Sequence, residues 1–289
     1  RELLMDGCAL DDLAPLPDIK GLTTFSLAGL DEPPLQIPDL SPLAAMQALK
    51  HLCLYNTTFQ ELPLGSLVGT LEALDISASL TQDLRWLTNL EVLRELEIAQ
   101  VEAPALDPLM ALSSLESLNV TACKVGDLAW LRNLVQLRTL KLNVTEIADL
   151  QPLASLSHLR SLSLGGVYID SSNKQSGNHL DVLSSLSDLE ELNVSCWQLG
   201  APTWLATLQQ LRVLDLSYTD IEDTACLRGI THLTELNLSE TPLHSLDGLS
   251  NSLQLRCLNL EKTLISNLNP LRLATELEEL SLRNTAIND

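Results

Sequence analysis

The chain has 289 residues, of which 38 are acidic and 17 are basic, so its formal net charge at neutral pH is −21. A charge of this sign repels phosphate backbones and anionic membrane surfaces, and we therefore predict a basic partner and no nucleic acid. No apolar run approaches the ~18 residues that a membrane-spanning helix requires, so we also predict no membrane span.

The cysteines are scattered along the chain, at Cys8, Cys53, Cys123, Cys196, Cys226 and Cys257. None belongs to a C-x-x-C pair, and their spacing fits neither a disulfide framework nor a zinc site. Free thiols favour a reducing compartment, so we predict an intracellular (cytoplasmic) protein. Because the chain begins at Arg1 inside a repeat, we expect a fragment, and a surface or secreted location stays open as an alternative.

An apolar pattern with a period of 22 residues runs through the chain. In residues 115–136 and 137–158, apolar residues occupy matching places, which we number repeat positions 1, 4, 6, 11, 14, 17 and 20; a small side chain stands at position 9. Position 1 recurs at Leu22, Leu49, Leu71, Leu93, Leu115, Leu137, Leu159, Leu189, Leu211, Leu233, Leu255 and Leu277. With a headless first repeat at Arg1, this makes 13 repeats and predicts a solenoid.

Each repeat divides into two predicted elements. Positions 2 to 7 alternate between polar and apolar residues, which predicts a strand with positions 4 and 6 inside and positions 3, 5 and 7 outside. Positions 14, 17 and 20 are spaced by three, which favours short helical or 3₁₀ turns. The strands must run parallel and lie closer together than the turns, so we expect the strands on the concave side. Leu140, at position 4, should be fully buried.

Two repeats are longer than the others, with 27 residues at 22–48 and 30 residues at 159–188. The first holds the proline-rich residues 31–42, for which we predict a stiff, non-helical excursion. The second holds the polar residues 168–179, of which we expect 171–178 to form an exposed, mobile loop. Insertions of this kind either contribute to binding or are tolerated without a role, and both interpretations stay open.

The pattern L-x-x-L-x-L-x-x-T-x-I-x-x-L-x-x-L-x-x-L resembles the leucine-rich repeat family. The 22-residue length and the tail I-x-D-L-x-P-L, seen from Ile147 to Leu153, are most similar to repeats of the regulatory subunit of protein phosphatase one and of bacterial internalins. The resemblance implies an α/β, right-handed horseshoe of about 13 parallel strands. It also implies a single domain over residues 1–289, which we expect to lack both caps.

One position departs from the family pattern. Position 9 is usually asparagine in this family, but here it is mostly threonine, whose hydroxyl can still bond the neighbouring backbone. Val101, Val167 and Trp197 stand at the same position, and we expect local irregularity there because these side chains cannot serve.

Basic residues concentrate at repeat position 2. Glu72, Arg94, Glu116 and Arg138 alternate in sign across neighbouring repeats. We interpret this column as a structural ladder of ion pairs, each contributing ~0.2–1 kcal/mol when exposed.

Nothing in the sequence predicts catalysis. His51 and Cys53 face outward on one predicted strand, with Asp75 on the next, and this set suggests a nucleophile. An open strand face, however, has no pocket that would exclude water or hold an oxyanion. Since phosphate loops, paired catalytic carboxylates and metal-ligand clusters are also missing, we predict a non-enzymatic protein without cofactor, metal or small-molecule substrate.

Ten of the 39 outward positions are acidic and two are basic, most of the rest are small and polar, and two acidic clusters stand out. The first comprises Asp75, Glu95 and Glu97, and the second comprises Glu191, Asp215 and Glu235. Adjacent carboxylates repel one another and have no evident folding rationale, whereas a surface of one sign attracts a partner of the other sign. The predicted partner-binding residues are these six together with Tyr55, Asn193, Tyr218 and Asn237.

Two functions fit this surface. We predict an intracellular scaffold or regulatory module that binds another protein, with a basic segment, on its acidic concave face; the resemblance to the phosphatase regulator implies this function. The alternative is an extracellular adhesin or recognition receptor, which the internalin resemblance implies. The acidity could also serve only to keep the protein soluble.

Overall fold

The computed structural model describes residues 1–289 apart from 9–11, 38, 82, 103–104, 170–178 and 288–289. The chain divides into two compact units. The first unit comprises Arg1–Lys141 and Thr145–Ala148, and the second comprises Leu142–Val144 and Asp149–Asp289. The expected loop at 171–178 lies outside the described residues, and the assignment of 1–289 to a single domain stays a prediction.

The first unit is a stack of short parallel strands, each followed by a single 3₁₀ turn. Its main strands are β1 (Glu2–Leu4), β2 (Thr24–Ser26), β4 (His51–Cys53), β6 (Ala73–Asp75), β7 (Glu95–Glu97), β8 (Ser117–Asn119) and β9 (Thr139–Lys141). Its turns are η1 (Leu16–Asp18), η2 (Ser41–Ala45), η3 (Gly65–Gly69), η4 (Arg85–Asn89), η5 (Asp107–Ala111) and η6 (Ala129–Asn133). Each strand pairs with the next at matching repeat positions, such as Leu74 with Leu96.

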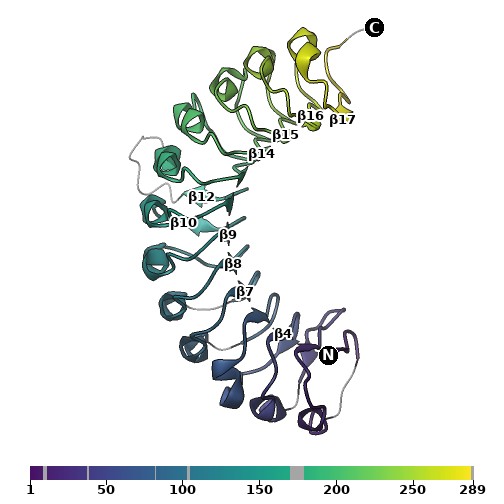
Figure 1. The fold of residues 1–289 in the computed structure, drawn as a ribbon, viewed down its shortest axis with the longest axis vertical. Coiled ribbons are helices and arrows are strands. Elements are labelled where there is room, and N and C mark those ends of the chain that lie inside the picture. The colour runs from purple at the N-terminus through teal and green to yellow at the C-terminus, as the bar shows by residue number, and fades with distance from the viewer. Residues whose placement is uncertain (9–11, 38, 82, 103–104, 170–178, 288–289) are drawn as a thin grey trace. The chain divides into compact units, whose positions relative to one another are not determined.

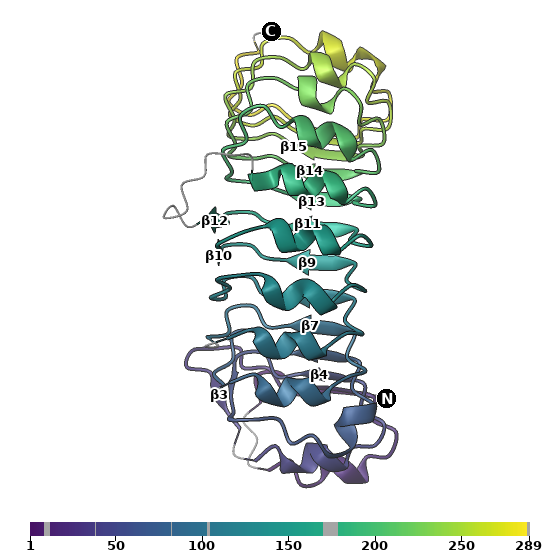
Figure 2. The ribbon, with the colours of Figure 1, turned by 90° about the vertical axis from the view of Figure 1, so that its left-hand side faces the viewer.

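The second unit repeats this arrangement. Its main strands are β11 (Ser161–Ser163), β13 (Glu191–Asn193), β14 (Val213–Asp215), β15 (Glu235–Asn237), β16 (Cys257–Asn259) and β17 (Glu279–Ser281). Its turns are η7 (Gln151–Ser155), η8 (His179–Ser185), η9 (Thr203–Thr207), η10 (Ala225–Leu227), η11 (Asp247–Leu249) and η12 (Asn269–Leu273). In each unit the strands lie on one side and the turns are stacked on the other (Figures 1 and 2). The predicted parallel-strand solenoid is confirmed.

Shorter two-residue strands lie outside these stacks. β3 (Leu35–Gln36) pairs in parallel with β5 (Thr57–Thr58) in the first unit. The described part of the proline-rich excursion includes β3, whereas Ser41 and Pro42 already belong to η2, so the non-helical prediction is wrong for these last two residues. The other two are β10 (Glu146–Ile147) and β12 (Tyr168–Ile169).

The core is built from the repeat's apolar positions. Leu140 has no exposed surface, which confirms the predicted inward direction of position 4. Position 6 is equally buried, as Leu54, Ile76 and Ile98 show. Because one turn of each repeat stacks on the next, the core extends along each unit as a continuous row of leucines.

Position 9 closes the bend after each strand. The hydroxyl of Thr219 donates to the carbonyl of Leu216 at 2.6 Å, and that of Thr241 donates to Leu238 at the same distance. The expectation that Trp197 cannot serve in this position is wrong. Its buried indole N–H donates to the carbonyl of Leu164, in the preceding repeat, at 2.7 Å. The indole N–H of Trp197 therefore takes the place of the threonine hydroxyl as donor, and its acceptor lies in the preceding repeat.

The residue at repeat position 8 adopts a left-handed backbone conformation in every repeat except the second, where Gly29 stands. Non-glycine residues with this conformation include Val144 with φ 52° and Tyr218 with φ 59°. The conformation turns the chain sharply away from the strand, so that position 9 can point inward. It is unfavourable for a β-branched side chain, and Val144 is therefore a point of local strain.

Candidate functional site: the strand face

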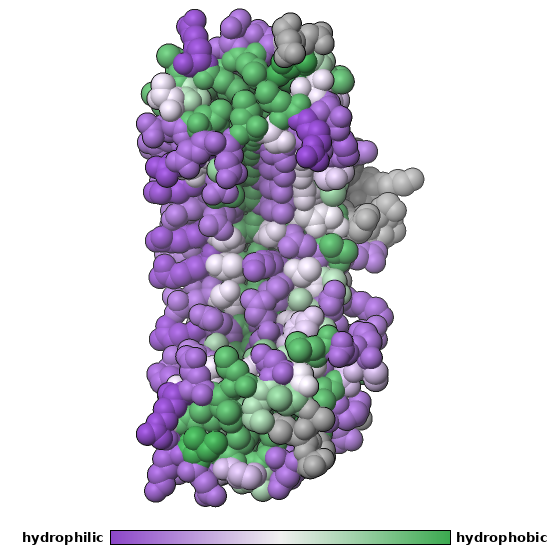
Figure 3. All heavy atoms as spheres, turned by 90° about the vertical axis from the view of Figure 1, so that its right-hand side faces the viewer, coloured by the Kyte–Doolittle hydropathy of each residue, from purple (hydrophilic) through white to green (hydrophobic). Residues whose placement is uncertain are grey.

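The strand face consists of repeat positions 3, 5 and 7, whose side chains point away from the core. This side of the protein is mostly hydrophilic above the strands (Figure 3). From β11 to β16, its fifteen positions include four acidic residues and no basic one, the acidic ones being Glu191, Asp215, Glu235 and Glu261.

Asparagine and aspartate at position 5 accept hydrogen bonds from the backbone, a structural role that the sequence interpretation did not include. The Oδ1 atom of Asp215 accepts a hydrogen bond from the backbone N–H of Ser217 at 2.9 Å, and Asn193 does the same for Ser195. These bonds satisfy a backbone donor at the point where each strand ends. The statement that the acidic clusters lack a folding rationale is therefore wrong for their two aspartates, Asp75 and Asp215.

The cluster of the first unit is held by its own hydrogen bonds. Asp75 lies directly opposite Glu97 on the neighbouring strand. The two oxygens of Asp75 accept hydrogen bonds from the backbone N–H of Ser77 at 2.8 Å and from the thiol of Cys53 at 3.7 Å. Glu97 accepts one from the amide of Asn119 at 2.6 Å. The structure thus brings Asp75 and Glu97 together and gives both oxygens of Asp75, but only one oxygen of Glu97, a donor among the described residues.

Glu95, the third member of this cluster, is exposed at position 3 of β7. Its carboxylate forms no hydrogen bond or ion pair with any residue that the structure describes. It is therefore the member of the first cluster that remains available to a partner.

The cluster of the second unit is more open. Glu191 and Glu235 occupy position 3 on either side of Val213, so two strand spacings of ~4.8 Å separate their backbones. Asp215 lies between Asn193 and Asn237 in the adjacent column.

The carboxylates of this second cluster keep most of their bonding capacity. Glu191 accepts one hydrogen bond from the hydroxyl of Ser161 at 2.8 Å. Within the described ranges, Glu235 forms no side-chain hydrogen bond, and Oδ2 of Asp215 has no donor. These oxygens are available to a partner.

The asparagines of the second unit add donors to these acceptors. Oδ1 of Asn237 accepts hydrogen bonds from the backbone N–H and the hydroxyl of Ser239, at 3.1 and 2.8 Å. This fixes the amide plane and leaves Nδ2 on the solvent side. Among the residues that the structure describes, neither Asn193 nor Asn237 uses Nδ2 as a donor, whereas Asn119 of the first unit already donates to Glu97.

The two predicted aromatic contacts lie beyond the strands. Tyr55 stands at position 7 with 41% of its surface exposed, and Tyr218 stands at the left-handed position 8 with 60% exposed. Tyr218 follows β14 directly and belongs to the same repeat as Asp215, while Tyr55 belongs to the first unit.

The position-2 column confirms the predicted ion-pair ladder. Lys50 pairs with Glu72 at 2.6 Å, and Arg94 pairs with Glu116. In the second unit Arg160 pairs with Glu190 at 3.0 Å. The Lys50 ammonium lowers the pKa of the Glu72 carboxyl, chiefly through this hydrogen bond. These basic side chains are thus engaged along the edge of the strand face.

Nucleophilic chemistry at Cys53 is disfavoured. Burial raises the pKa of its thiol, and the charge of Asp75 adds to that effect. The ring Nδ1 of His51 lies 3.4 Å from the hydroxyl of Thr24. In the described part of the chain no group of three or more histidine, cysteine or acidic residues is placed to hold a metal ion.

None of the helices in the residues that the structure describes has the length and apolar character to cross a bilayer.

The signal for the position-5 role was present in the sequence. Aspartate or asparagine occupies position 5 in six repeats, and each accepts a hydrogen bond from the backbone N–H two residues later: Asp75, Asn119, Asn193, Asp215, Asn237 and Asn259. This spacing is typical of side chains that bond the backbone locally.

Comparison with known proteins places the fold. No protein-family model and no curated protein sequence matches the chain. An internalin, InlF of Listeria monocytogenes, is 21% identical, with a TM-score of 0.78 over 96% of this chain and 86% of the internalin. A leucine-rich repeat protein of Leptospira interrogans is 19% identical, with a TM-score of 0.80 over 100% of this chain and 73% of its own length.

A plant receptor shares the same architecture. The leucine-rich repeat ectodomain of the membrane receptor kinase GASSHO1/SCHENGEN3 from Arabidopsis thaliana, solved in complex with CASPARIAN STRIP INTEGRITY FACTOR 2, is 22% identical, with a TM-score of 0.64. The match covers 98% of this chain and 38% of the ectodomain. Together with the 22-residue period and the stacked parallel strands, these likenesses show that the chain has the leucine-rich repeat fold.

Proposed function

We propose that the chain is a non-enzymatic interaction module that binds a basic segment of a partner protein on the strand face of its second unit. The observation that carries the proposal is the cluster of Glu191, Asp215 and Glu235, which lies among fifteen strand-face positions without a basic residue. In this function the module acts as a scaffold or a regulatory subunit and performs no chemistry of its own.

The electrostatics of the cluster favour a basic partner. Carboxylates fixed on one face attract opposite charge and raise the rate of association, an effect that is strongest at low salt. The position-2 ladder engages most nearby basic residues, so few remain to neutralise the cluster. Glu235, with no protein partner among the described residues, is the strongest candidate for a direct ion pair.

The hydrogen-bonding groups favour an extended segment. The Nδ2 donors of Asn193 and Asn237 flank Oδ2 of Asp215 at the spacing of adjacent strands. Because hydrogen bonds hold each of these side chains, little conformational entropy is lost when a partner binds them. Tyr218, exposed in the same repeat as Asp215, adds an apolar surface and a hydroxyl.

The comparisons support binding as the general function. The plant receptor ectodomain was solved with a bound factor, so this fold presents a binding surface in that protein. A surface adhesin or recognition receptor is the second candidate, which the likeness to the internalin favours. Labelling intact cells that make the full-length protein with a membrane-impermeant reagent would separate this candidate from an intracellular scaffold.

A selection experiment tests the proposed function. A library of random peptides would be selected against the wild-type chain and counter-selected against Asp215→Asn/Glu235→Gln. Asparagine at 215 keeps the oxygen that accepts the Ser217 N–H, so this variant removes charge without removing that bond. We expect lysine- and arginine-rich peptides that bind the wild type about tenfold or more tightly than the variant at low salt.

The matched control is Asp188→Asn/Glu276→Gln, which removes two exposed carboxylates outside the strand face. It should bind the selected peptides as the wild type does. Peptides without a basic excess, or equal binding by both double variants, would contradict the proposed site.

A further inference from the structure

A cavity in the second unit lies where the repeat pattern changes. Position 14 is buried in all but the last of the twelve repeats that reach it, and it is leucine in ten of them, namely Leu13, Leu40, Leu62, Leu84, Leu106, Leu128, Leu150, Leu180, Leu246 and Leu268. The two exceptions are consecutive, Pro202 and Thr224. Both are buried, but both side chains are shorter than leucine. Pro202, the one of the two that lines the cavity, leaves volume unfilled where the other repeats place a leucine.

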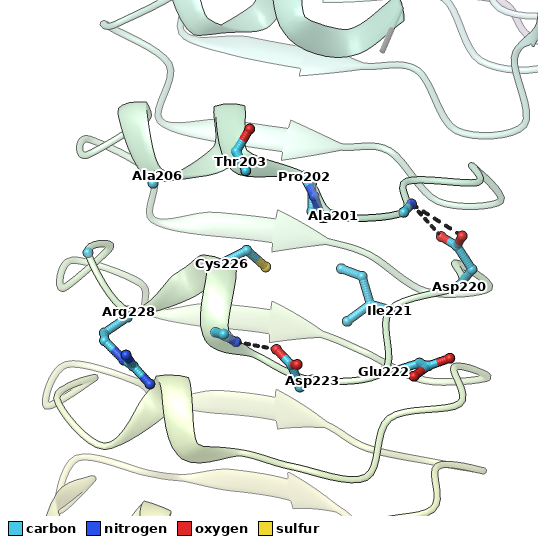
Figure 4. A pocket seen from close by; sticks show the side chains of 13 residues that line it. Ala201, Pro202, Thr203, Ala206, Asp220, Ile221, Glu222, Asp223, Cys226 and Arg228 are labelled. Carbon is cyan, nitrogen blue, oxygen red and sulfur yellow. Dashed lines mark hydrogen bonds between the residues drawn. The ribbon is translucent and has the colours of Figure 1, made fainter. Parts of the chain in front are cut away.

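The cavity has a volume of about 740 Å³ and lies between the turns η9 and η10 (Figure 4). Ala201 and Pro202 line one side, and Ile221 and the thiol of Cys226 line the other. The lining is mainly apolar, and the volume falls in the range of roughly 300–1,000 Å³ that is usual for small-molecule sites. The cavity could therefore hold an apolar body of that size.

Charged groups surround this apolar space. The lining includes the carboxylates of Asp220, Glu222 and Asp223 and the guanidinium of Arg228, so three negative charges and one positive charge give a net charge of −2. Arg228 lies at the opposite end from Asp220 and Glu222 (Figure 4). One end of the cavity is thus acidic, and the other end would repel a cation.

Backbone donors fix two of these carboxylates at the wall. Asp220 accepts hydrogen bonds from the N–H groups of Leu199 at 2.6 Å and Gly200 at 3.2 Å. Oδ1 of Asp223 accepts one from the N–H of Ala225 at 2.7 Å. Oδ2 of Asp223 and the carboxylate of Glu222 have no hydrogen-bond donor in the described part of the chain. These oxygens are available to a ligand.

We propose that this cavity binds a small organic cation, a primary amine or a guanidine carried on an apolar body. The apolar part would contact Ile221 and Pro202, and the cationic group would bond Asp223 and Glu222. The loops and turns form this site, so it is separate from the strand face and does not depend on the proposed function. The sequence predicted only a protein partner, so a small-molecule ligand at this site would be a second kind of ligand for the chain.

Cys226 supplies a reporter at the cavity wall. Its thiol is half-buried, and burial, with a further contribution from Asp223, raises its pKa to about 11. The thiol is therefore protonated and slow to alkylate at neutral pH, but its alkylation can be followed at pH ~9 by peptide mapping. Cys196 is exposed outside the cavity and serves as an internal reference.

The test uses phenethylammonium as the probe and phenylacetate as its anionic counterpart. Phenethylammonium should bind, as measured by ligand-observed NMR, and should slow the alkylation of Cys226 by about threefold or more without slowing that of Cys196. Phenylacetate should do neither, because the acidic end repels it. Absence of phenethylammonium binding, or equal binding of both probes, would overturn the proposal.

Two variants locate the binding. Glu222→Gln/Asp223→Asn removes two charges while keeping the oxygen that accepts the Ala225 N–H, and it should weaken phenethylammonium binding about tenfold. Pro202→Leu restores the leucine of the other repeats, and it should abolish binding without lowering Tm. If affinity survived both substitutions, the cation would not occupy this cavity. The charge variant tests the proposal even if the leucine variant failed to fold.

Discussion

The two acidic clusters of the strand face come from the same repeat pattern but differ in how their side chains are engaged. In the first unit, Asp75 and Glu97 lie opposite each other and accept hydrogen bonds from Cys53 and Asn119. In the second unit, the Nδ2 groups of Asn193 and Asn237 and the Oδ2 atom of Asp215 have no hydrogen-bond partner among the described residues, although Oδ1 of each side chain accepts a backbone N–H. Equal local charge therefore does not mean equal capacity to bind.

The largest expected effect is on the free energy of unfolding and concerns the buried leucine at position 4, which the two units share. Leu96 in β7 and Leu214 in β14 both occupy position 4, with 0% and 1% of their surface exposed. Leu96→Ala and Leu214→Ala should each lower the free energy of unfolding by about 2–5 kcal/mol, through lost apolar burial and a cavity. Urea denaturation measures both effects. A loss below about 0.5 kcal/mol in only one unit would show that the two cores are not built alike.

A second effect belongs to the second unit and depends on pH. The pKa of Cys226 is raised to about 11, chiefly by burial, so the folded state holds this proton where the unfolded state has released it. Stability should therefore fall as pH rises from about 9 to about 11, by roughly 1–2 kcal/mol once partial solvent exposure is allowed for. The difference between wild type and Cys226→Ala isolates this contribution. Parallel stability curves for the two proteins above pH ~9 would contradict it.

The regular part of the fold follows from the sequence because each repeat has the same pattern of apolar and polar residues. Alternation at positions 2 to 7 requires a strand with Leu140 inside, and the spacing of three after position 14 requires a tight turn. The exchange of donors at Trp197 could not be predicted in this way, because its indole bonds Leu164 in the preceding repeat. Periodicity describes one repeat, whereas this contact depends on how two particular repeats stack.

The candidate site was predictable in composition but not in bonding. The sequence places Asp75 and Asp215 in the same column, and the repeat pattern alone does not say which of them is bonded by its neighbours. The distinction arises from neighbours one repeat away, Cys53 for the first and Asn193 and Asn237 for the second. The cavity beside Pro202 and Thr224 did have a sequence signal, since these two consecutive repeats lack the position-14 leucine.

A third prediction separates charge from structure at Asp215. Asp215→Ala removes the acceptor of the Ser217 N–H and should lower the free energy of unfolding by about 1 kcal/mol. Asp215→Asn keeps an oxygen in the same place and should change stability little. Thermal unfolding of the two variants side by side provides the measurement. Equal losses would mean that the charge, and not the hydrogen bond, stabilises this strand end.

The smallest expected effect concerns the strained bend after β9. Val144 has φ 52° and is 59% exposed, so its side chain is strained and gains little from packing. Val144→Asn should raise the free energy of unfolding by about 1 kcal/mol, because asparagine tolerates this conformation better. Ala78, at the same position with φ 58°, provides a control, since Ala78→Asn relieves less strain. A loss of stability in the Val144 variant would show that this bend stores no strain.

The most direct test compares the two clusters on one ligand. A lysine-rich peptide obtained by selection would be titrated against wild type, Glu95→Gln/Glu97→Gln and Asp215→Asn/Glu235→Gln at low and at high salt. The account predicts about a tenfold rise in Kd for the second-unit variant at low salt, shrinking as salt is added, and little change for the first-unit variant. An equal loss in both variants, or a loss only in the first-unit variant, would contradict the assignment of binding to the second unit.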